Sequence, residues 1–480
     1  MPTPPSNRVP RGVLHAAAAA AIGGVTWLIF SRAFLNYDTL YSLIWGRDLA
    51  GGHTPDYEIT LAPTPHPLAE LVGIPVSLLG EDGGYTAMLA LALLAWGAFV
   101  WGVFLLGRES FGWAVGALAA FVVATRDPFV SQAVRAYVDI PFLALVVSAA
   151  VLEMRRPRRG LSVLVLIGLA GLLRPAAWLL GAAYWLYLLP ALDRRRAVIL
   201  AAVAAAPPVL WALSDLAVTG DALHSLTFTR DTADTLGRPQ GIENVPEIMP
   251  RRLGEILRWV PLVGGTAGFF LALHYARRRA LVPAALAVLG GISFVVIGIA
   301  GLSLLGRYLF LPAAMVAIFF GFAALGWIGT PPDRGRRWWI AGATVLLIAF
   351  VGSTISHQTD RLDRLRDGIQ LRGGIQDDLR GLTEDPAARP LLERCAPVYV
   401  PNHRPVPILA WYLDREPEVF VSAQLERPLR GIYVAPANRI VQEKFVLDPR
   451  DPKRIALAVP AGFRRVAGNA SWSLYQRGCE

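Results

Sequence analysis

Long apolar runs separated by arginine clusters are the feature that most constrains how this chain folds. A helix needs about 20 apolar residues to cross the ~30 Å hydrocarbon core of a bilayer. The 480 residues are 54% hydrophobic and only 17% charged, which is too apolar for a soluble protein of this length. We predict an α-helical polytopic membrane protein with about eleven spans, at residues 14–34, 85–106, 112–125, 140–154, 161–173, 176–191, 197–217, 255–275, 280–300, 306–328 and 338–355.

The arginine clusters predict which side of the membrane each connection occupies. Dense clusters at 155–160, 193–196, 276–280 and 331–337 alternate with connections that lack them. Short Arg-rich loops stay in the cytoplasm, so we place the N-terminus there and the C-terminus outside the bacterial plasma membrane. The net charge of +10 therefore reflects topology and not nucleic-acid binding. We interpret the first apolar run as a retained helix, because no small-x-small cleavage site follows it.

A change in polarity divides the chain into two predicted domains. Residues 1–355 form the transmembrane domain, whose first outer loop covers 35–84. Residues 356–480 begin with a charged helix and continue with short β-like runs, which is typical of a small extracytoplasmic α/β domain. Both cysteines, Cys395 and Cys479, lie in this second domain. The sequence fits either a disulfide between them or two free thiols.

The first outer loop contains two stretches with apolar residues at helical spacing, at 37–50 and 67–79. We predict that both are interfacial helices on the outer leaflet, and that the first rests its aromatic face on lipid. Asp38 follows directly on the first span, where a carboxylate is costly unless it has a role. It is either a general base in a partly desolvated cleft or the N-cap of its helix.

Polar residues also gather where other spans reach the outer face. Asp139 and Arg135 lie at the outer end of the fourth span. Asp139 is a second carboxylate beside Asp38, a helix cap, or the salt-bridge partner of Arg126 or Arg135. His66, just before a proline, either binds a phosphate or sugar or faces lipid headgroups.

Two arginines are candidates for binding phosphate, because the guanidinium fork suits its oxygens. Arg clusters flank both ends of 161–190, so this run crosses outward and returns, and its turn places Arg174 at the outer face. Arg307, followed by Tyr308, occupies the outer end of a later span. The alternative for Arg307 is snorkelling to the headgroups.

The outward connection at 219–241 is a further candidate segment. It carries His224 and Arg230 and is long for a simple connector. We predict an acceptor-binding or lid segment, with an ordinary connecting loop as the alternative.

Taken in order, four motifs resemble those of the GT-C superfamily of polyprenyl-phosphate-sugar-dependent glycosyltransferases. The branch with protein O-mannosyltransferases and lipid A aminoarabinose transferases is most similar. These enzymes have an Asp after the first span, a Lys/His-Pro-Pro-Leu motif, an Asp-Pro at the fourth span and a Gly-Leu-x-x-Leu-x-Lys segment. The matching stretches here are Asp38 with Tyr41 and Gly52, His66-Pro67-Leu68, Asp139-Ile140-Pro141, and GLAGLLRPAAW with Arg174 in place of Lys. The match covers roughly 14–190, with GRYLFLP at 306–312 as a weaker echo, and the missing proline and the Arg for Lys bear on the subfamily and the donor sugar.

The resemblance implies an inverting transferase that moves a sugar from polyprenyl phosphate to an acceptor hydroxyl at the outer membrane face. Asp38 would then be the base, Asp139 would orient the acceptor or tune Asp38, and Arg174 with Arg307 would stabilise the leaving phosphate. The acceptor is a glycan, lipid or protein. The candidate substrate-binding residues are Tyr41, His66, Arg135, Arg174, His224, Arg230, Arg307 and Tyr308.

We infer no cofactor and no metal from the sequence, although a divalent metal that bridges Asp38 and Asp139 stays an alternative. Two other classes of function also fit. A transporter or flippase of lipid-linked sugars would place ionisable residues along the membrane midplane. A cell-envelope binding protein would use the C-terminal domain. The candidate polar residues gather at the outer face, which favours the enzyme.

Overall fold

A bundle of apolar helices forms most of the computed structural model, which describes residues 10–330, 335–447 and 459–479. Each predicted span overlaps a helix of this bundle. The overlapping helices are α1 (Arg11–Phe30), α4 (Gly80–Phe111), α5 (Trp113–Thr125), α7 (Asp139–Arg155), α8 (Leu161–Gly171), α9 (Ala176–Leu188), α10 (Arg194–Thr219), α13 (Trp259–Tyr275), α14 (Arg277–Ile299), α15 (Phe310–Leu325) and α16 (Arg336–Glu384).

Not all of these helices are long and apolar enough to cross a membrane by themselves. Within the described ranges, six helices are long and apolar enough to cross a membrane. The number rises to eight if two bent pairs are each one span. The first pair is α5 with α6 (Asp127–Val134), bent by 65°, and the second is α12 (Val245–Leu257) with α13, bent by 108°. The polytopic helical fold is thus confirmed, whereas the number eleven stays a prediction.

Helix α15 lies at the centre of the bundle, packed by α5, α13 and α14. Small residues let these helices approach closely, as is common between membrane helices. A Cβ at Gly268 of α13 would lie 1.9 Å from the carbonyl oxygen of Phe319 on α15. Only glycine fits at that contact, which holds α15 and the segment before it in a fixed position.

The first outer loop folds into α2 (Tyr37–Ala50) and α3 (Pro67–Ser77), close to the predicted helices. Asn36 caps α2, since its Oδ1 accepts from the backbone N–H groups of Asp38 and Thr39. The cap alternative for Asp38 is therefore wrong. The expected lipid-facing aromatic side of α2 is also wrong, because Tyr41 and Trp45 are only 0% and 1% exposed and pack inside the protein.

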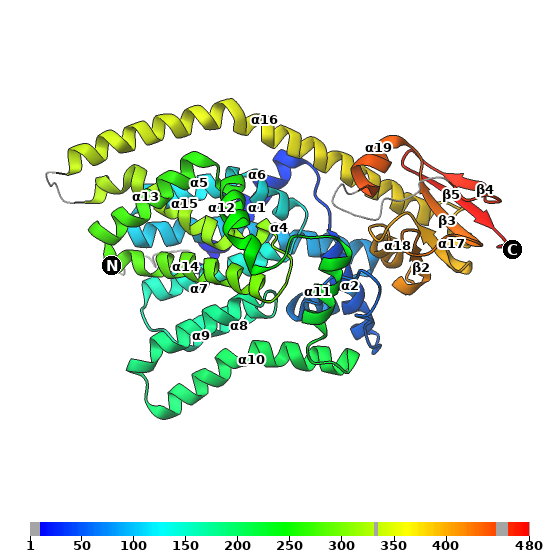
Figure 1. Cartoon of the computed structure of the whole chain (residues 1–480), viewed down its shortest axis with the longest axis horizontal. Coiled ribbons are helices and arrows are strands. Elements are labelled where there is room, and N and C mark those ends of the chain that lie inside the picture. The colour runs from blue at the N-terminus through cyan, green and yellow to red at the C-terminus, as the bar shows by residue number, and fades with distance from the viewer. Residues whose placement is uncertain (1–9, 331–334, 448–458, 480) are drawn as a thin grey trace, which may run out of the picture.

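A single helix connects the two predicted domains. Helix α16 has 49 residues and runs through the predicted boundary, from the bundle at the left of Figure 1 to the C-terminal domain at the right. On the way it contacts the segment that follows α1, where Arg32 Nη1 donates to the carbonyl oxygen of Gln370 at 3.2 Å. The C-terminal domain is therefore a continuation of the bundle and not a tethered module.

The C-terminal domain is a five-stranded sheet with order β2-β1-β3-β5-β4, in which β1 pairs in parallel with β2 and β3 and the other pairs are antiparallel. A disulfide joins Cys395 to Cys479, so the two cysteines are not free thiols. Helix α18 packs between the sheet and α2. The elements are α17 (Arg389–Arg394), β1 (Val398–Val400), α18 (Val406–Tyr412), β2 (Phe420–Ser422), β3 (Gly431–Pro436), α19 (Arg439–Val441), the π-helix η6 (Gln442–Val446), β4 (Arg464–Gly468) and β5 (Trp472–Arg477).

Candidate active site

Four charged side chains from distant parts of the sequence meet at one place. Asp38 and Asp139 lie in the first turns of α2 and α7, Arg174 lies in the turn between α8 and α9, and Arg307 lies in the 3₁₀-helix η3 (Gly306–Leu309). Arg174 Nη2 donates to Asp139 Oδ2 at 2.7 Å. Arg307 reaches both acids, with Nη1 3.4 Å from Asp38 Oδ2 and Nε 3.9 Å from Asp139 Oδ2. We call these four residues the floor cluster.

Burial distinguishes the two carboxylates of the floor cluster. The side chain of Asp139 is 4% exposed and that of Arg174 is 9% exposed, so this pair is desolvated and locked together. The side chains of Asp38 and Arg307 are 17% and 19% exposed, and a single longer contact joins them. Asp38 is therefore the carboxylate that a ligand can reach, while Asp139 holds the two guanidinium groups in place.

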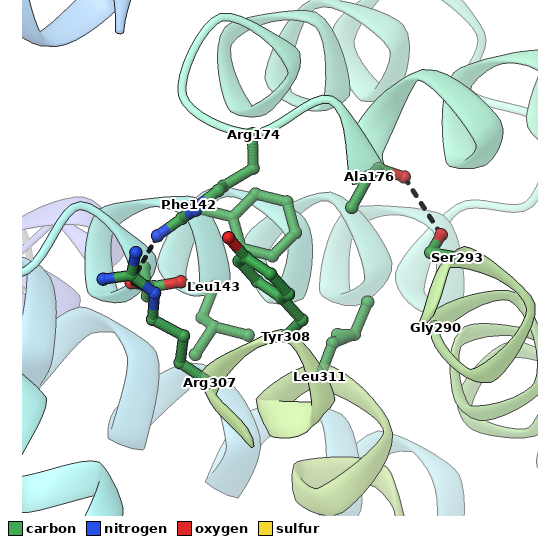
Figure 2. Close-up of a pocket in the computed structure, with 10 residues that line it drawn as sticks. Phe142, Leu143, Arg174, Ala176, Gly290, Ser293, Arg307, Tyr308 and Leu311 are labelled. Atoms are coloured by element: carbon green, nitrogen blue, oxygen red, sulfur yellow. Dashed lines mark hydrogen bonds and ion pairs between the residues drawn. The ribbon is translucent and has the colours of Figure 1, made fainter. Parts of the chain in front are cut away.

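Aromatic rings support the two guanidinium groups. The guanidinium of Arg174 lies 5.1 Å from the ring centre of Tyr308, and that of Arg307 lies 5.3 Å from the ring centre of Tyr137. Figure 2 shows Arg174 and Arg307 approaching each other from opposite sides beside Tyr308. Such cation–π contacts fix the planes of the guanidinium groups without neutralising their charge.

The floor cluster opens into a cavity of about 850 Å³ between the bundle and the C-terminal domain. A cavity of this volume can take a sugar together with part of an acceptor. Asp38, Arg174 and Arg307 line it on the bundle side, with Tyr37, His66, Arg135, Tyr137 and Tyr308 around them. Its other walls come from α11 (His224–Thr235) with the loop after it, from α16 and from the C-terminal domain. The residues that line these walls include Thr229, Thr232, Arg238, Arg372, Gln376, Asn402, His403, Arg404, Lys444 and Phe445.

His66 reaches this cavity from the start of α3, where Pro67 takes the predicted first-turn position. The backbone N–H of His66 donates to Glu70 Oε1 at 3.0 Å. Burial, with Arg174 and Arg307 nearby, holds the pKa of His66 well below the ordinary value of an imidazole. This environment favours the neutral imidazole, which can donate or accept a hydrogen bond.

Arg135 lines the cavity, but its expected ion pair with Asp139 does not form. Instead Arg135 Nη2 donates to the hydroxyl of Tyr137 at 3.1 Å. The other expected partner, Arg126, donates to Gln358 Oε1 at 2.8 Å. Asp139 pairs with Arg174, which the sequence had placed on the same face without linking the two.

Three predicted substrate-binding residues are not among the described residues that line the cavity. Tyr41 is buried between the rings of Tyr37 and Trp45. His224 is buried against the carbonyl oxygen of Tyr57, with Nε2 at 3.3 Å. Arg230 donates to the carbonyl oxygen of Ala300 at 2.7 and 3.2 Å, which ties α11 to the end of α14. In the predicted lid segment, the neighbouring threonines Thr229 and Thr232 reach the cavity instead.

Several residues of the site were not singled out from the sequence. Tyr137 lies two positions before Asp139 and Glu70 lies four positions after His66, so their proximity in sequence was the available signal. Glu70 fixes the loop before α3, because its Oε2 also accepts from the hydroxyl of Tyr57 at 2.5 Å. The cavity residues of the C-terminal domain carry no recognisable motif.

A metal ion does not fit the floor cluster as it stands. The described part of the chain contains no group of three or more His, Cys, Asp and Glu side chains that could hold a metal. The guanidinium of Arg307 contacts both carboxylates that a bridging metal would require. We therefore derive no step through a metal.

No family model matches the chain, and no curated protein matches its sequence. Among solved structures, the chain is similar to ArnT from Cupriavidus metallidurans bound to undecaprenyl phosphate, with a TM-score of 0.57, 15% identity and 97% of each chain covered. The apo form of that protein gives 0.58. The archaeal oligosaccharyltransferase AglB from Archaeoglobus fulgidus, in complex with an inhibitory peptide and a dolichol-phosphate, gives 0.50 at 11% identity, covering 94% of this chain and 75% of AglB. The expected GT-C fold is thereby confirmed over nearly the whole chain.

Proposed function

We propose that this chain is a membrane-embedded, inverting glycosyltransferase that takes a sugar from a polyprenyl-phosphate donor at the outer face of the bacterial plasma membrane. The observation that carries the proposal is the floor cluster, where a reachable carboxylate meets one buried guanidinium, that of Arg174, and one partly exposed guanidinium, that of Arg307, beside a cavity. The similar fold of ArnT, solved with undecaprenyl phosphate, supports a lipid phosphate as the ligand of the arginines.

The chemistry assigned to the cavity needs one base and one anion site. Asp38 takes the proton from the acceptor hydroxyl as the hydroxyl oxygen attacks the anomeric carbon. The bond between that carbon and the donor phosphate breaks, and its electron pair leaves with the polyprenyl phosphate. Attack from the side opposite the leaving group inverts the anomeric carbon.

The two guanidinium groups stabilise the charge that develops on the leaving phosphate. Arg174 and Arg307 are held by Asp139 and by the tyrosine rings before the ligand arrives, so little reorganisation is needed during the reaction. The floor cluster carries two positive and two negative charges. A bound phosphate therefore adds net negative charge, and the remaining cations of the cavity compensate for it.

The clustering of ionisable residues disfavours the transporter alternative. Asp38, Asp139, Arg174 and Arg307 come from four separate elements and still converge at one end of the cavity. A transport pathway needs polar groups distributed across the membrane. The convergence instead fits chemistry on one side.

The most direct cellular test is mass spectrometry of envelope glycans and lipid-linked sugars in a deletion strain. We expect one sugar to disappear from the envelope while its polyprenyl-phosphate form accumulates. The wild-type chain should restore the sugar, and Asp38→Asn, expressed at the same level, should not. Unchanged lipid-linked sugars in the deletion strain would contradict the proposed function.

A further inference from the structure

Hydrogen bonds that lie outside the floor cluster hold the start of α2 against the end of α6. Three consecutive carbonyl oxygens, those of residues 134–136, accept these bonds. The backbone N–H of Phe34 donates to the first at 3.0 Å, and Asn36 donates to the second from its backbone N–H at 3.1 Å and from Nδ2 at 2.9 Å. Thr39 Oγ1 donates to the third at 2.6 Å. The segment that leads into α2 is therefore fixed to one short turn that is far away in the chain.

The end of α6 explains why these carbonyl oxygens are available. The last carbonyl groups of a helix have no partner inside that helix. Helix α6 ends at Val134, and Ala136 has a φ of 51°, in the left-handed region, which stops the helix from continuing. Asn36 and Thr39 supply donors at a buried place, since the two residues are only 3% and 4% exposed. Loss of either donor leaves a buried polar group without a partner.

The side-chain amide of Asn36 acts on both helices at once. Its Oδ1 accepts from the backbone N–H groups of Asp38 and Thr39, which forms the cap of α2. Its Nδ2 donates to the carbonyl oxygen of Arg135 and, at 3.1 Å, to Thr39 Oγ1. All four hydrogen-bonding positions of the amide are thus used within the protein. Asn36 lines the cavity but has none of these positions left for a substrate.

The same turn leads to the other half of the floor cluster. The ring of Tyr137, the residue after the turn, lies 5.3 Å from the guanidinium of Arg307, and its hydroxyl accepts from Arg135 Nη2 at 3.1 Å. Asp139 follows two residues later, in the first turn of α7. One turn therefore accepts hydrogen bonds from the segment around Asp38 and also positions the neighbours of Asp38 in the floor cluster.

Asp38 depends on this support because its own side chain is only loosely held. Its carboxylate is 17% exposed and reaches Arg307 at 3.4 Å, a longer contact than the 2.7 Å between Arg174 and Asp139. A general base has to lie within hydrogen-bond reach of the proton that it takes. A displacement of about 1 Å lowers a rate by about 100-fold. The position of the α2 backbone therefore decides whether Asp38 reaches the acceptor hydroxyl.

We propose that Asn36 and Thr39 are positioning residues that hold Asp38 in place for the transfer step. The inference rests on the proposed function, because it takes Asp38 as the base. Neither side chain touches the reacting atoms, and both act through the backbone at the start of α2. The buried ion pair of the floor cluster does not involve these two side chains, so binding of the donor phosphate does not depend on them.

The test uses the purified full-length chain in detergent, with the lipid extract of the deletion strain as donor and the envelope fraction of that strain as acceptor. Thr39→Val removes the hydroxyl at nearly constant shape, and Asn36→Ser keeps a capping oxygen but removes Nδ2. We expect each variant to lower kcat by about 10 to 100-fold, while the apparent KM for the donor lipid and the affinity for undecaprenyl phosphate change by less than about twofold. Thr39→Ser keeps the hydroxyl and should restore kcat.

Thr26→Val is the matched control. It also removes a buried threonine hydroxyl, which accepts from Trp96 Nε1 at 2.9 Å between α1 and α4, and neither residue is in the described cavity lining. We expect Thr26→Val to lower the melting temperature as Thr39→Val does but to leave kcat unchanged. A role of Thr39 in stability alone would give the two variants the same kcat.

Three results would overturn the inference: an unchanged kcat in Thr39→Val, an equal loss in Thr26→Val, or a loss in Thr39→Ser as large as in Thr39→Val. Thr39→Val decides the matter if Asn36→Ser does not fold. If the wild type transfers no sugar, the proposed function fails. Hydrogen–deuterium exchange then still tests the structural link, because the backbone N–H groups of residues 38–40 should exchange faster in Thr39→Val than in Thr26→Val. Equal exchange in the two variants would overturn the link itself.

Discussion

The floor cluster and the wall that the C-terminal domain contributes to the same cavity differ in exposure. We call this wall, formed by Asn402, His403, Arg404, Lys444 and Phe445, the roof. In the floor cluster every charge has a partner within 4 Å, and the side chains of Asp139 and Arg174 are less than a tenth exposed. In the roof, Lys444 is exposed and Arg404 is partly exposed. The side chains of the floor cluster are therefore held by one another, whereas Lys444 of the roof is accessible to solvent.

Direct contacts nevertheless connect the C-terminal domain to the helical bundle. Arg47 of α2 pairs with Asp414 at 2.7 Å, and Trp411 Nε1 of α18 donates to the carbonyl oxygen of Glu81 at 3.0 Å. Arg380 of α16 pairs with Asp82 at 3.0 Å. These contacts join the C-terminal domain to the start of α4 and to the helix that carries Asp38.

The largest effect is expected from Asp38→Asn. Removal of the base should lower kcat by about two to four orders of magnitude, while the affinity for undecaprenyl phosphate changes little because the arginines remain. Asp48→Asn, on the same helix but outside the cavity lining, is the matched control. Turnover of Asp38→Asn close to that of the control would remove Asp38 from the reaction.

Removal of the disulfide tests whether the C-terminal domain can be destabilised without an effect on the floor cluster. The segment between Cys395 and Cys479 contains all the roof residues, and a cross-link over such a loop stabilises a fold by about 2 to 4 kcal/mol. We expect Cys395→Ser/Cys479→Ser to lower the melting temperature but not the affinity for undecaprenyl phosphate, because no residue of the floor cluster lies between the two cysteines. Reduced wild type should behave like the variant. A loss of lipid affinity instead would mean that the two walls are not separable.

Glu70 should give the chain a pH-dependent stability. Burial raises the pKa of Glu70 to about 7, above the unfolded value of about 4.3. The folded state then binds more protons between these values, so this contribution to stability is full at low pH and is lost as the pH rises through 7. The melting temperature of the wild type, relative to Glu70→Gln, should fall from pH 5 to pH 8. His66 is present in both proteins and cancels in the difference; a flat difference would contradict the raised pKa.

The smallest effect is expected from Arg230→Gln. The exposed Arg230 side chain contacts a backbone carbonyl outside the cavity, so kcat/KM should change less than about twofold. Thr229→Val, on the same helix but in the cavity lining, is the informative neighbour. An effect of Arg230→Gln larger than that of Thr229→Val would restore the predicted substrate-binding role of Arg230.

Local sequence patterns predicted the helices well because apolar length and Arg clusters are properties of single segments. The approximate bounds of α2, α3 and α7 and the turn at Arg174 were accessible in this way. The lipid-facing side of α2 was not, since residues that face lipid and residues that pack inside a membrane protein have similar composition.

Contacts between segments that are far apart in the chain could not be predicted from the sequence. Arg307 and Asp38 are 269 positions apart, and no spacing rule brings them to 3.4 Å. The sequence left the cap of α2 as one of two roles for Asp38. It did not point to Asn36, two residues earlier, although Asn is an equally good capping residue. The roof residues were not predicted because they have no motif and reach the cavity only through the packing of the C-terminal domain against α2.

The most direct test of the central claim is the affinity of the purified chain for undecaprenyl phosphate in the wild type and in Arg174→Gln. If the floor cluster binds the donor phosphate, the variant should bind about 10 to 100 times more weakly. Asp139→Asn/Arg174→Gln removes the unpaired buried acid and should show the same loss, and Arg258→Gln, which breaks the ion pair with Asp127 elsewhere, should show none. Equal affinity of the wild type and Arg174→Gln would contradict the account.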